Sequence, residues 1–143
     1  MSNFTITIEA QPKAVERRKI FDELHRSNAS QTGDSGLQSL TVLLRDAEDN
    51  VVGGLLGETY WGWFNVEQMW IEESLRKQGY GAKLLSAAEK EAVARGCVAS
   101  FLDTFSFQAL EFYRKFGYEV FGTLENFPPG HKRFYMKKSL KED

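Results

Sequence analysis

The sequence predicts a mixed α/β fold built on a central, mostly antiparallel sheet, and three observations support this. Apolar and polar residues alternate in several short segments, which indicates half-buried strands. Two later segments carry apolar residues at helical spacing, and a glycine-bearing turn opens the first of them. The chain has 143 residues, the size of one domain, so we expect residues 1–143 to form a single domain.

The composition excludes several classes of protein. Lys and Arg number 18 against 20 Asp and Glu, a net charge of −2, so nucleic acid is not an expected partner. The sequence shows neither a leader pattern nor an apolar run long enough for a membrane span, so we expect a cytoplasmic protein without a membrane partner. With Cys97 as the single cysteine and only two histidines, neither a disulfide nor a metal site is expected.

The first third of the chain predicts one strand, one helix and one loop. Phe4, Ile6 and Ile8 alternate with polar residues, which predicts a first strand. A loose apolar stripe after Pro12 predicts a helix to about residue 26. Residues 27–36 are small and polar and include two glycines, which predicts a loop.

The middle of the chain predicts an antiparallel hairpin and a further strand. Alternating residues at 40–44 and the run 51–60 flank a turn at 47–50. In the next strand, Phe64 and Val66 share one parity whereas Met69 and Ile71 share the other. One extra residue restores a common face, so we predict a bulge within residues 67–70.

The last third alternates helices and strands. A helical stripe runs from Gly79 to a stop at Gly96, and a second helix over residues 109–116 stops at Gly117. Strands are predicted at residues 97–102, 118–124 and 132–137.

The residues of the turn at 76–82 are those expected of an anion-binding site. Its glycines permit close approach of a ligand, and the N-H groups that open the following helix favour phosphate oxygens. Arg76, Lys77 and Lys83 add positive charge. A P-loop is excluded because GK[ST] is absent, and a Rossmann fingerprint fits poorly because Leu84 occupies the third glycine position. Simple turn chemistry is the alternative explanation of the glycines.

Two motifs resemble those of the GNAT-type N-acetyltransferase superfamily. The segment RKQGYGA at 76–82 resembles the family's R/Q-x-x-G-x-G/A, and ALEFYRKFGY at 109–118 resembles A-x-x-F-Y-x-x-x-G-F. The resemblance implies a GNAT-like sheet of six to seven strands, splayed between strands 4 and 5, with helices on both faces. It also implies acetyl-CoA as cosubstrate.

The resemblance implies where that cosubstrate binds. Residues 78–82 would hold its pyrophosphate, and the backbone of residues 69–71 would pair with its pantetheine arm and polarise the thioester. The predicted cofactor-binding residues are Met69, Trp70, Ile71, Arg76, Lys77, Gln78, Gly79, Tyr80, Gly81, Ala82, Ser106 and Tyr113.

Two residues are the catalytic candidates. Tyr113 matches the tyrosine that protonates the departing thiolate in many family members, although the helical stripe alone would make it a core residue. Glu67, at the predicted bulge, is the candidate base for the acceptor ammonium, and the alternative is a solvated or ion-paired carboxylate. Glu72 and Glu73 belong to the turn and are less well placed.

Three further features leave alternatives open. Ser106 stands where many relatives carry Asn, and it either helps to hold pantetheine or caps the following helix. Aromatic residues at 60–64 and Phe127 either wall an acceptor pocket or form core or dimer contacts. Cys97 is expected to be a small core residue.

These features predict an N-acetyltransferase that transfers acetyl directly from acetyl-CoA to the primary amine of a small molecule. A non-catalytic CoA-binding or sensing module is the main alternative, and transfer to a protein or peptide amine is a further one. A homodimer is possible, because relatives are often dimers.

Overall fold

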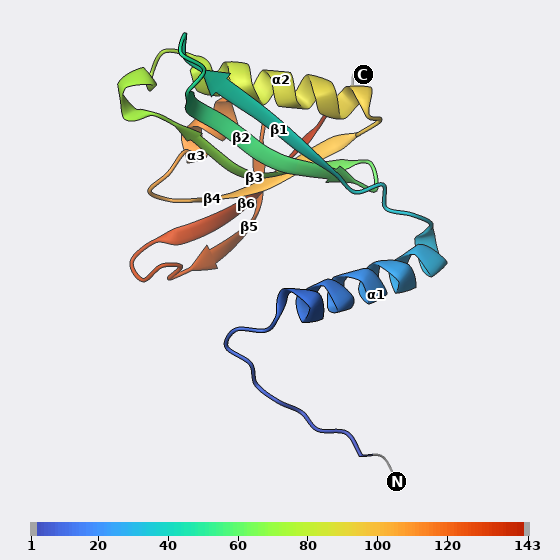
Figure 1. Ribbon diagram of the computed structural model, residues 1–143. Helices are drawn as coiled ribbons and strands as arrows, with labels where there is room; N and C mark the ends of the chain where they lie inside the picture. The colour runs from blue at the N-terminus through green and yellow to red at the C-terminus, as the bar shows by residue number, and fades with distance from the viewer. Residues whose placement is uncertain (1–2, 142–143) are drawn as a thin grey trace. The chain divides into compact units, whose positions relative to one another are not determined.

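The computed structural model describes residues 3–141 and divides the chain into two compact units, one up to Ser35 and one from Gly36 onward. We describe each unit by itself. The helices and strands (Figure 1) are α1 (Ala14–Thr32), β1 (Gln38–Arg45), β2 (Val51–Tyr60), β3 (Trp63–Ile71), α2 (Tyr80–Ala94), β4 (Ala99–Phe105), α3 (Leu110–Lys115), β5 (Glu119–Glu125) and β6 (Lys132–Ser139).

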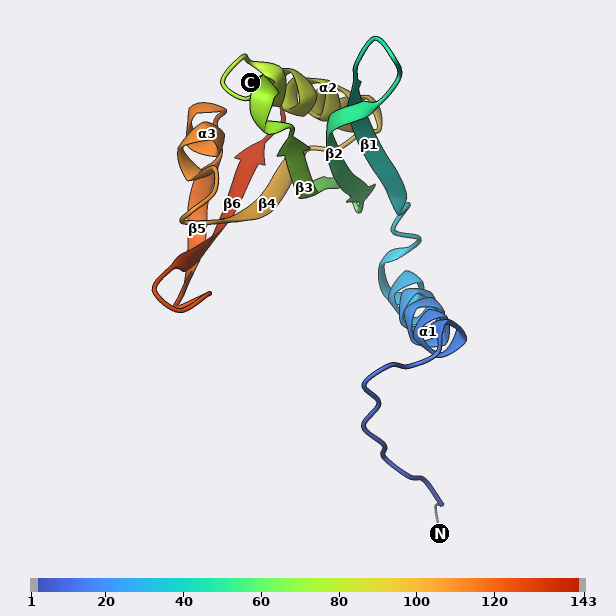
Figure 2. The same cartoon turned by 60° about the vertical axis from the view of Figure 1, so that its left-hand side comes forward.

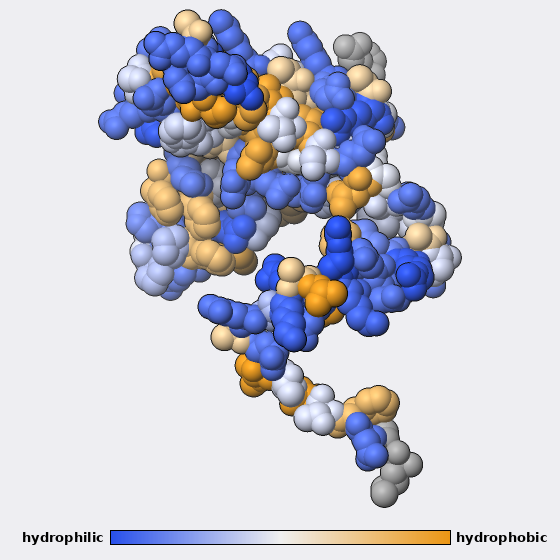
Figure 3. All heavy atoms as spheres, in the orientation of Figure 1, coloured by the Kyte–Doolittle hydropathy of each residue, from blue (hydrophilic) through white to orange (hydrophobic). Residues whose placement is uncertain are grey.

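The predicted first strand is wrong. Residues 3–9 have no regular structure, and the side chains of Phe4, Ile6 and Ile8 are 90%, 97% and 99% exposed. Alternation only places the apolar side chains on one face of an extended segment. A stable strand also needs a neighbouring strand with which its backbone groups form hydrogen bonds. No strand among the described residues pairs with this segment. Figure 3 shows apolar side chains on the surface of this unit.

Helix α1 is longer than predicted, so the predicted loop at 27–36 is wrong for residues 27–32. The small polar residues bond back to helix carbonyls: Ser30 Oγ donates to the Ser27 carbonyl over 2.6 Å, and Thr32 Oγ1 donates to the Asn28 carbonyl over 3.2 Å. The helix ends at Gly33, whose φ of 81° interrupts it.

The second unit holds a six-stranded sheet in the order β1-β2-β3-β4-β6-β5, antiparallel except between β3 and β4. These two strands pair only from Trp63 with Ala99 to Val66 with Leu102, and they diverge beyond that point (Figure 2). The predicted splay is therefore confirmed, because β3 and β4 correspond to the predicted fourth and fifth strands.

The predicted bulge is confirmed and lies at one residue. Leu56 pairs with Gln68 and the next residue of β2, Gly57, pairs with Val66, so Glu67 has no partner on β2. The insertion restores one face for the strand, since Phe64 and Val66 before it are buried and Met69 and Ile71 after it are half-buried.

Helices α2 and α3 pack on the same face of the sheet and share one core. Its fully buried members include Leu55, Phe64, Leu85, Ala88 and Met136. Both helices end at predicted glycines, Gly96 and Gly117, which have positive φ. No helix among residues 3–141 has the length and apolar character needed to cross a membrane.

Candidate active site

A cleft of 860 Å³ opens where β3 separates from β4. Val66 to Ile71 line one wall, and residues 102–105 with Tyr113 of α3 line the other. A second cavity of 460 Å³ shares Met69, Trp70 and Ile71 with the cleft and extends to the turn before α2. Both volumes are typical of cavities that hold small molecules.

The strand between the two cavities has a free edge. Beyond Val66, β3 pairs with β2 on one side only, because β4 has diverged on the other. Alternate backbone N-H and C=O groups of residues 67–71 therefore lack a strand partner on the cleft side. Such an edge can pair with an extended ligand that carries amide groups.

The turn before α2 and the first residues of that helix line the second cavity. Lys77 and Gly79 have positive φ, of 62° and 86°, and the helix begins directly after Gly79. The first N-H groups of an α-helix have no partner within it and form an anion site.

The space around Gly81 indicates whether a phosphate-bearing cosubstrate fits this turn. A Cβ built on Gly81 would lie 3.5 Å from the nearest atoms of Ile71 and Phe112, an ordinary packing distance. The protein itself therefore does not require glycine here. A ligand close to the backbone would require it, so the residues present fit a bound pyrophosphate.

Two polar side chains of the turn hold it in shape. Arg76 donates from Nε to the Ile71 carbonyl over 2.9 Å, which ties the turn to the end of β3, and Arg76 lines both cavities. Gln78 donates from Nε2 to the Ser74 carbonyl over 3.0 Å. Its side chain thus serves the turn, and Gln78 is not among the residues that line either cavity in the described chain.

The remaining predicted cofactor residues of the strand and turn line the second cavity, namely Met69, Trp70, Ile71, Lys77, Gly79, Tyr80, Gly81 and Ala82. Sequence reasoning placed them together because they are neighbours in the chain.

Tyr113 belongs to both the core and the cleft. Its side chain is only 7% exposed and packs against Phe112 and Tyr118, yet it lines the cleft. Burial, followed by the negative charge of Asp103, raises the pKa of Tyr113 to about 12. The phenol therefore stays protonated near neutral pH and is able to donate a proton.

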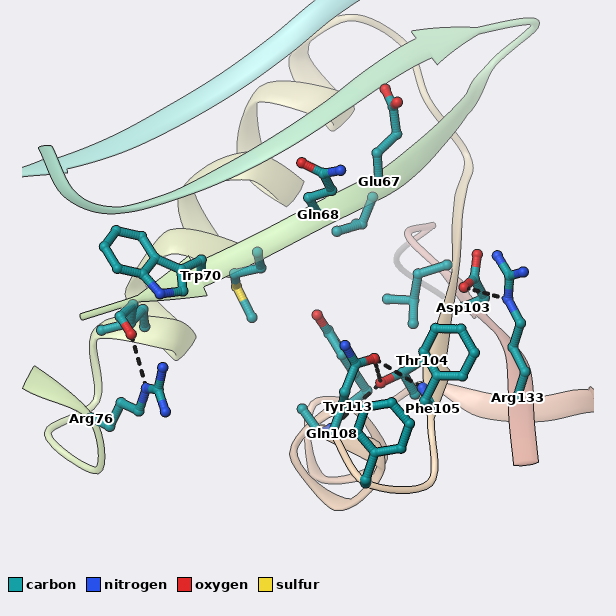
Figure 4. A pocket seen from close by; sticks show the side chains of 16 residues that line it. Glu67, Gln68, Trp70, Arg76, Asp103, Thr104, Phe105, Gln108, Tyr113 and Arg133 are labelled. Carbon is teal, nitrogen blue, oxygen red and sulfur yellow. Dashed lines mark hydrogen bonds and ion pairs between the residues drawn. The ribbon is translucent and has the colours of Figure 1, made fainter. Parts of the chain in front are cut away.

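Glu67 is an exposed residue of the cleft wall. In Figure 4 its carboxylate lies on one side of β3, and the Tyr113 side chain, which comes from α3, lies on the other. The charge of Glu67 also helps to raise the pKa of Tyr60, after the larger effects of burial and Glu58. Glu67 thus lies within electrostatic reach of Tyr60, on the side of the strand away from Tyr113.

Ser106 is engaged by β6. Its Oγ accepts a hydrogen bond from the Lys132 N-H over 3.0 Å, and it is not among the described residues that line either cavity. It also does not cap α3, because the N-cap residue of that helix is Ala109. Its role in cofactor binding stays a prediction.

Sequence reasoning missed five polar residues of the cleft, which are Gln68, Asp103, Thr104, Gln108 and Arg133. Gln108 accepts the Phe105 N-H through Oε1 over 3.0 Å and so shapes the start of α3. Arg133 donates from Nε to Asp103 Oδ1 over 2.8 Å. A carboxylate inside the otherwise uncharged run of β4 was the available signal for Asp103.

The predicted aromatic residues fall into different environments. Phe64 is completely buried in the core. Trp61 contacts Tyr60, and Trp63 contacts Phe101, with ring centroids 6.2 and 6.0 Å apart. Phe127 packs on the cleft residue Phe105 at 5.6 Å. Phe127 therefore packs on the cleft wall.

An open strand edge, an N-H-rich turn and a protonated tyrosine beside a splayed sheet define an acetyltransferase of the GNAT type. Residues 6–118 match the acetyltransferase (GNAT) family, and the chain belongs to this family.

Relatives extend the match over nearly the whole chain. The chain is 33% identical over 136 residues to Acetyltransferase Atu2258 of Agrobacterium fabrum, covering 95% of this chain and 98% of the relative. It is 34% identical over 91 residues to a blasticidin-S acetyltransferase of Streptomyces morookaense, and the match covers 63% of this chain and 67% of the relative. The crystal structure of an acetyltransferase from Agrobacterium tumefaciens aligns with a TM-score of 0.87 at 33% identity, and the alignment covers 96% of this chain and 99% of that one.

More distant structures share the fold alone. They include an aminoglycoside 6'-N-acetyltransferase in complex with coenzyme A, at 21% identity and a TM-score of 0.65, covering 98% of this chain and 99% of that one.

Proposed function

We propose that this protein transfers the acetyl group of acetyl-CoA directly to the primary amine of a small molecule, with both substrates bound at once. The observation that carries the proposal is the unpaired edge of β3, which runs between the anion-binding turn and the cleft beside Tyr113.

The two cavities divide the binding of the cosubstrate. The N-H groups at the start of α2 and the cations Arg76 and Lys77 would hold the diphosphate. The backbone groups of residues 69–71 that have no partner would pair with the pantetheine amides, whereas the Ile71 carbonyl already accepts from Arg76. A free N-H near the bulge would donate to the thioester oxygen. Bound acetyl-CoA supplies the activated acyl group.

The cleft supplies two proton-transfer groups. Glu67, directly or through water, would accept the proton of the acceptor ammonium, so that the free amine forms a C-N bond with the acyl carbon. Tyr113 would donate its proton to the sulfur as the C-S bond breaks. The nitrogen, now bonded to the acyl carbon, would lose its second proton to solvent, and Tyr113 would regain one from solvent.

Direct transfer requires no covalent enzyme intermediate. Cys97 is buried ahead of β4, and burial raises the pKa of its thiol, which makes it a poor nucleophile. This agrees with the prediction that Cys97 is a small core residue.

A small-molecule acceptor is supported by one relative. The Streptomyces morookaense relative is named for acetylation of blasticidin S, an antibiotic, and it is 34% identical to this chain over 91 residues. The 860 Å³ cleft has the size for a drug-like molecule.

Two measurements on the full chain test the proposal. Calorimetry should detect acetyl-CoA binding, and thiol release in the presence of an amine panel should be amine-dependent. Binding without amine-dependent thiol release would favour a non-catalytic CoA-binding module. Absence of acetyl-CoA binding by folded protein would refute both. Acetylation of peptide amines but not of any small amine would move the acceptor to proteins.

A further inference from the structure

Arg133 and Asp103 form an ion pair at one end of the cleft. Arg133 comes from β6 and Asp103 from β4, and Nε lies 2.8 Å from Oδ1. Figure 4 shows the pair at the opposite end of the cleft from Arg76, with Tyr113 between them. The end at Arg76 adjoins the anion-binding turn, so the end at Arg133 is left for the acceptor.

Aromatic rings hold the Arg133 guanidinium in place. Its Cζ lies 5.3 Å from the ring centroid of Phe105, 5.0 Å from that of Phe127 and 5.3 Å from that of Tyr135. The side chain is 26% exposed. A guanidinium fixed by one ion pair and three rings loses little further freedom when it binds a ligand.

The guanidinium of Arg133 has hydrogen-bond donors that are not used within the protein. Asp103 engages Nε, and no group among residues 3–141 forms a hydrogen bond with the two Nη atoms of Arg133. These terminal nitrogens form a planar fork that matches the two oxygens of a carboxylate.

The charges of the cleft also disfavour a polycationic acceptor. The charged residues that line it are the carboxylates Glu67 and Asp103 and the guanidiniums of Arg76 and Arg133, which balance. A site selective for a polyamine would carry an excess of carboxylates.

We propose that the Nη atoms of Arg133 bind a carboxylate of the acceptor, so that the substrate class is an amine that also carries a carboxylate. This inference rests on the proposed acetyltransferase function. Asp103 acts as a positioning residue, because it engages Nε and leaves the two Nη atoms without a hydrogen-bond partner among the described residues.

Matched acceptor pairs test the inference. Phenylalanine, lysine and β-alanine would each be compared with the corresponding carboxamide, with thiol release from acetyl-CoA as the readout. The carboxylates should be preferred in kcat/KM. Arg133→Met should lower kcat/KM for the carboxylates about tenfold to a hundredfold while leaving the carboxamides and the Kd of acetyl-CoA nearly unchanged. Arg133→Lys should restore part of the preference.

Further variants separate binding from structural effects. Arg45→Gln, an exposed arginine of β1 outside both cavities, should change neither class of acceptor. The double variant Arg133→Met with Asp103→Asn removes both charges, so the Asp103 side chain is not left as an unpaired carboxylate. This variant should also show no preference for acceptors that carry a carboxylate. Circular dichroism verifies that each variant is folded.

Three results would overturn the inference. One is equal use of carboxylates and carboxamides by the wild type, which would leave the proposed function intact. Another is an equal loss for both classes in Arg133→Met. If no acceptor releases thiol, the proposed function fails, and calorimetry of the same acids with the protein and coenzyme A decides the inference. Binding that Arg133→Met abolishes supports it, and weak or indiscriminate binding refutes it.

Discussion

Gly57 of β2 lies so close to Asn65 of β3 that a Cβ on the glycine would overlap the Asn65 carbonyl oxygen. The same Cβ would lie 2.8 Å from the ring of Phe64. Gly57 is also the residue at which the β2-β3 register shifts, so the bulge at Glu67 depends on this close approach of two backbones.

Gly57→Ala should therefore destabilise the sheet at its bulge. We expect the free energy of unfolding to fall by about 1–3 kcal/mol, because the new methyl must displace backbone. Thermal unfolding should show a Tm lower by roughly 3–10 °C. Gly122→Ala on β5 is the matched control, since its Cβ would lie 3.9 Å from the nearest atom, in Tyr135. Equal stability of the two variants would contradict this account of the bulge.

Gly81→Ala should separate stability from cosubstrate binding. The position is helical and its Cβ has ordinary contacts, so the protein should gain about 0.5–1 kcal/mol of stability. If residues 78–82 cradle a diphosphate, the methyl should weaken acetyl-CoA binding about tenfold or more. Calorimetry measures the second effect. Ser86→Ala on the same helix should leave affinity unchanged, and unaltered affinity in Gly81→Ala would place the diphosphate elsewhere.

Tyr113→Phe should lower kcat by about a hundredfold or more with little change in the KM for acetyl-CoA. Because the pKa of Tyr113 is raised to about 12, its protonated form persists across the usual assay range. The wild type should therefore show no loss of this acid between pH 6 and about 10.

Tyr118→Phe controls for the removal of a buried hydroxyl. Tyr118 donates to Glu89 and lies 2.8 Å from Ser100 Oγ, so the variant should lose about 1–3 kcal/mol of stability and keep its kcat. An equal kcat loss in the two variants would mean that Tyr113 acts through packing.

Glu67→Gln should reduce turnover most strongly near neutral pH. An alkyl ammonium with a pKa near 10 is almost fully protonated at pH 7, so loss of a base should cost about tenfold or more there. The deficit should shrink as the pH rises toward the amine pKa, because solvent then supplies free amine. Glu111→Gln, on the exposed side of α3, provides the control. A deficit that stays constant with pH would exclude Glu67 as the base.

Much of the second unit follows from local pattern. The parity change between Val66 and Met69 predicted the bulge, because side chains on a strand alternate strictly between its faces. The glycines at 96 and 117 predicted helix ends for the same local reason, since a left-handed residue cannot continue a helix. The turn proposed to bind the diphosphate is likewise a run of neighbours in the chain.

The errors fall where a local pattern required a distant partner. Phe4, Ile6 and Ile8 alternate as a strand should, but alternation does not supply the neighbouring strand that completes the hydrogen bonds. Residues 27–32 resemble a loop in composition, but they continue the helix, and the side chains of Ser30 and Thr32 bond to its carbonyls.

The sequence by itself determined the strand parity, the bulge, the glycine turn and the helix ends, because each depends on residues a few positions apart. Only the tertiary structure decided that Arg133 meets Asp103, 30 residues away, and that both stand across the cleft from Arg76. The cause is sheet topology: β6 inserts between β4 and β5, and strand order is fixed by packing and backbone pairing over the whole domain.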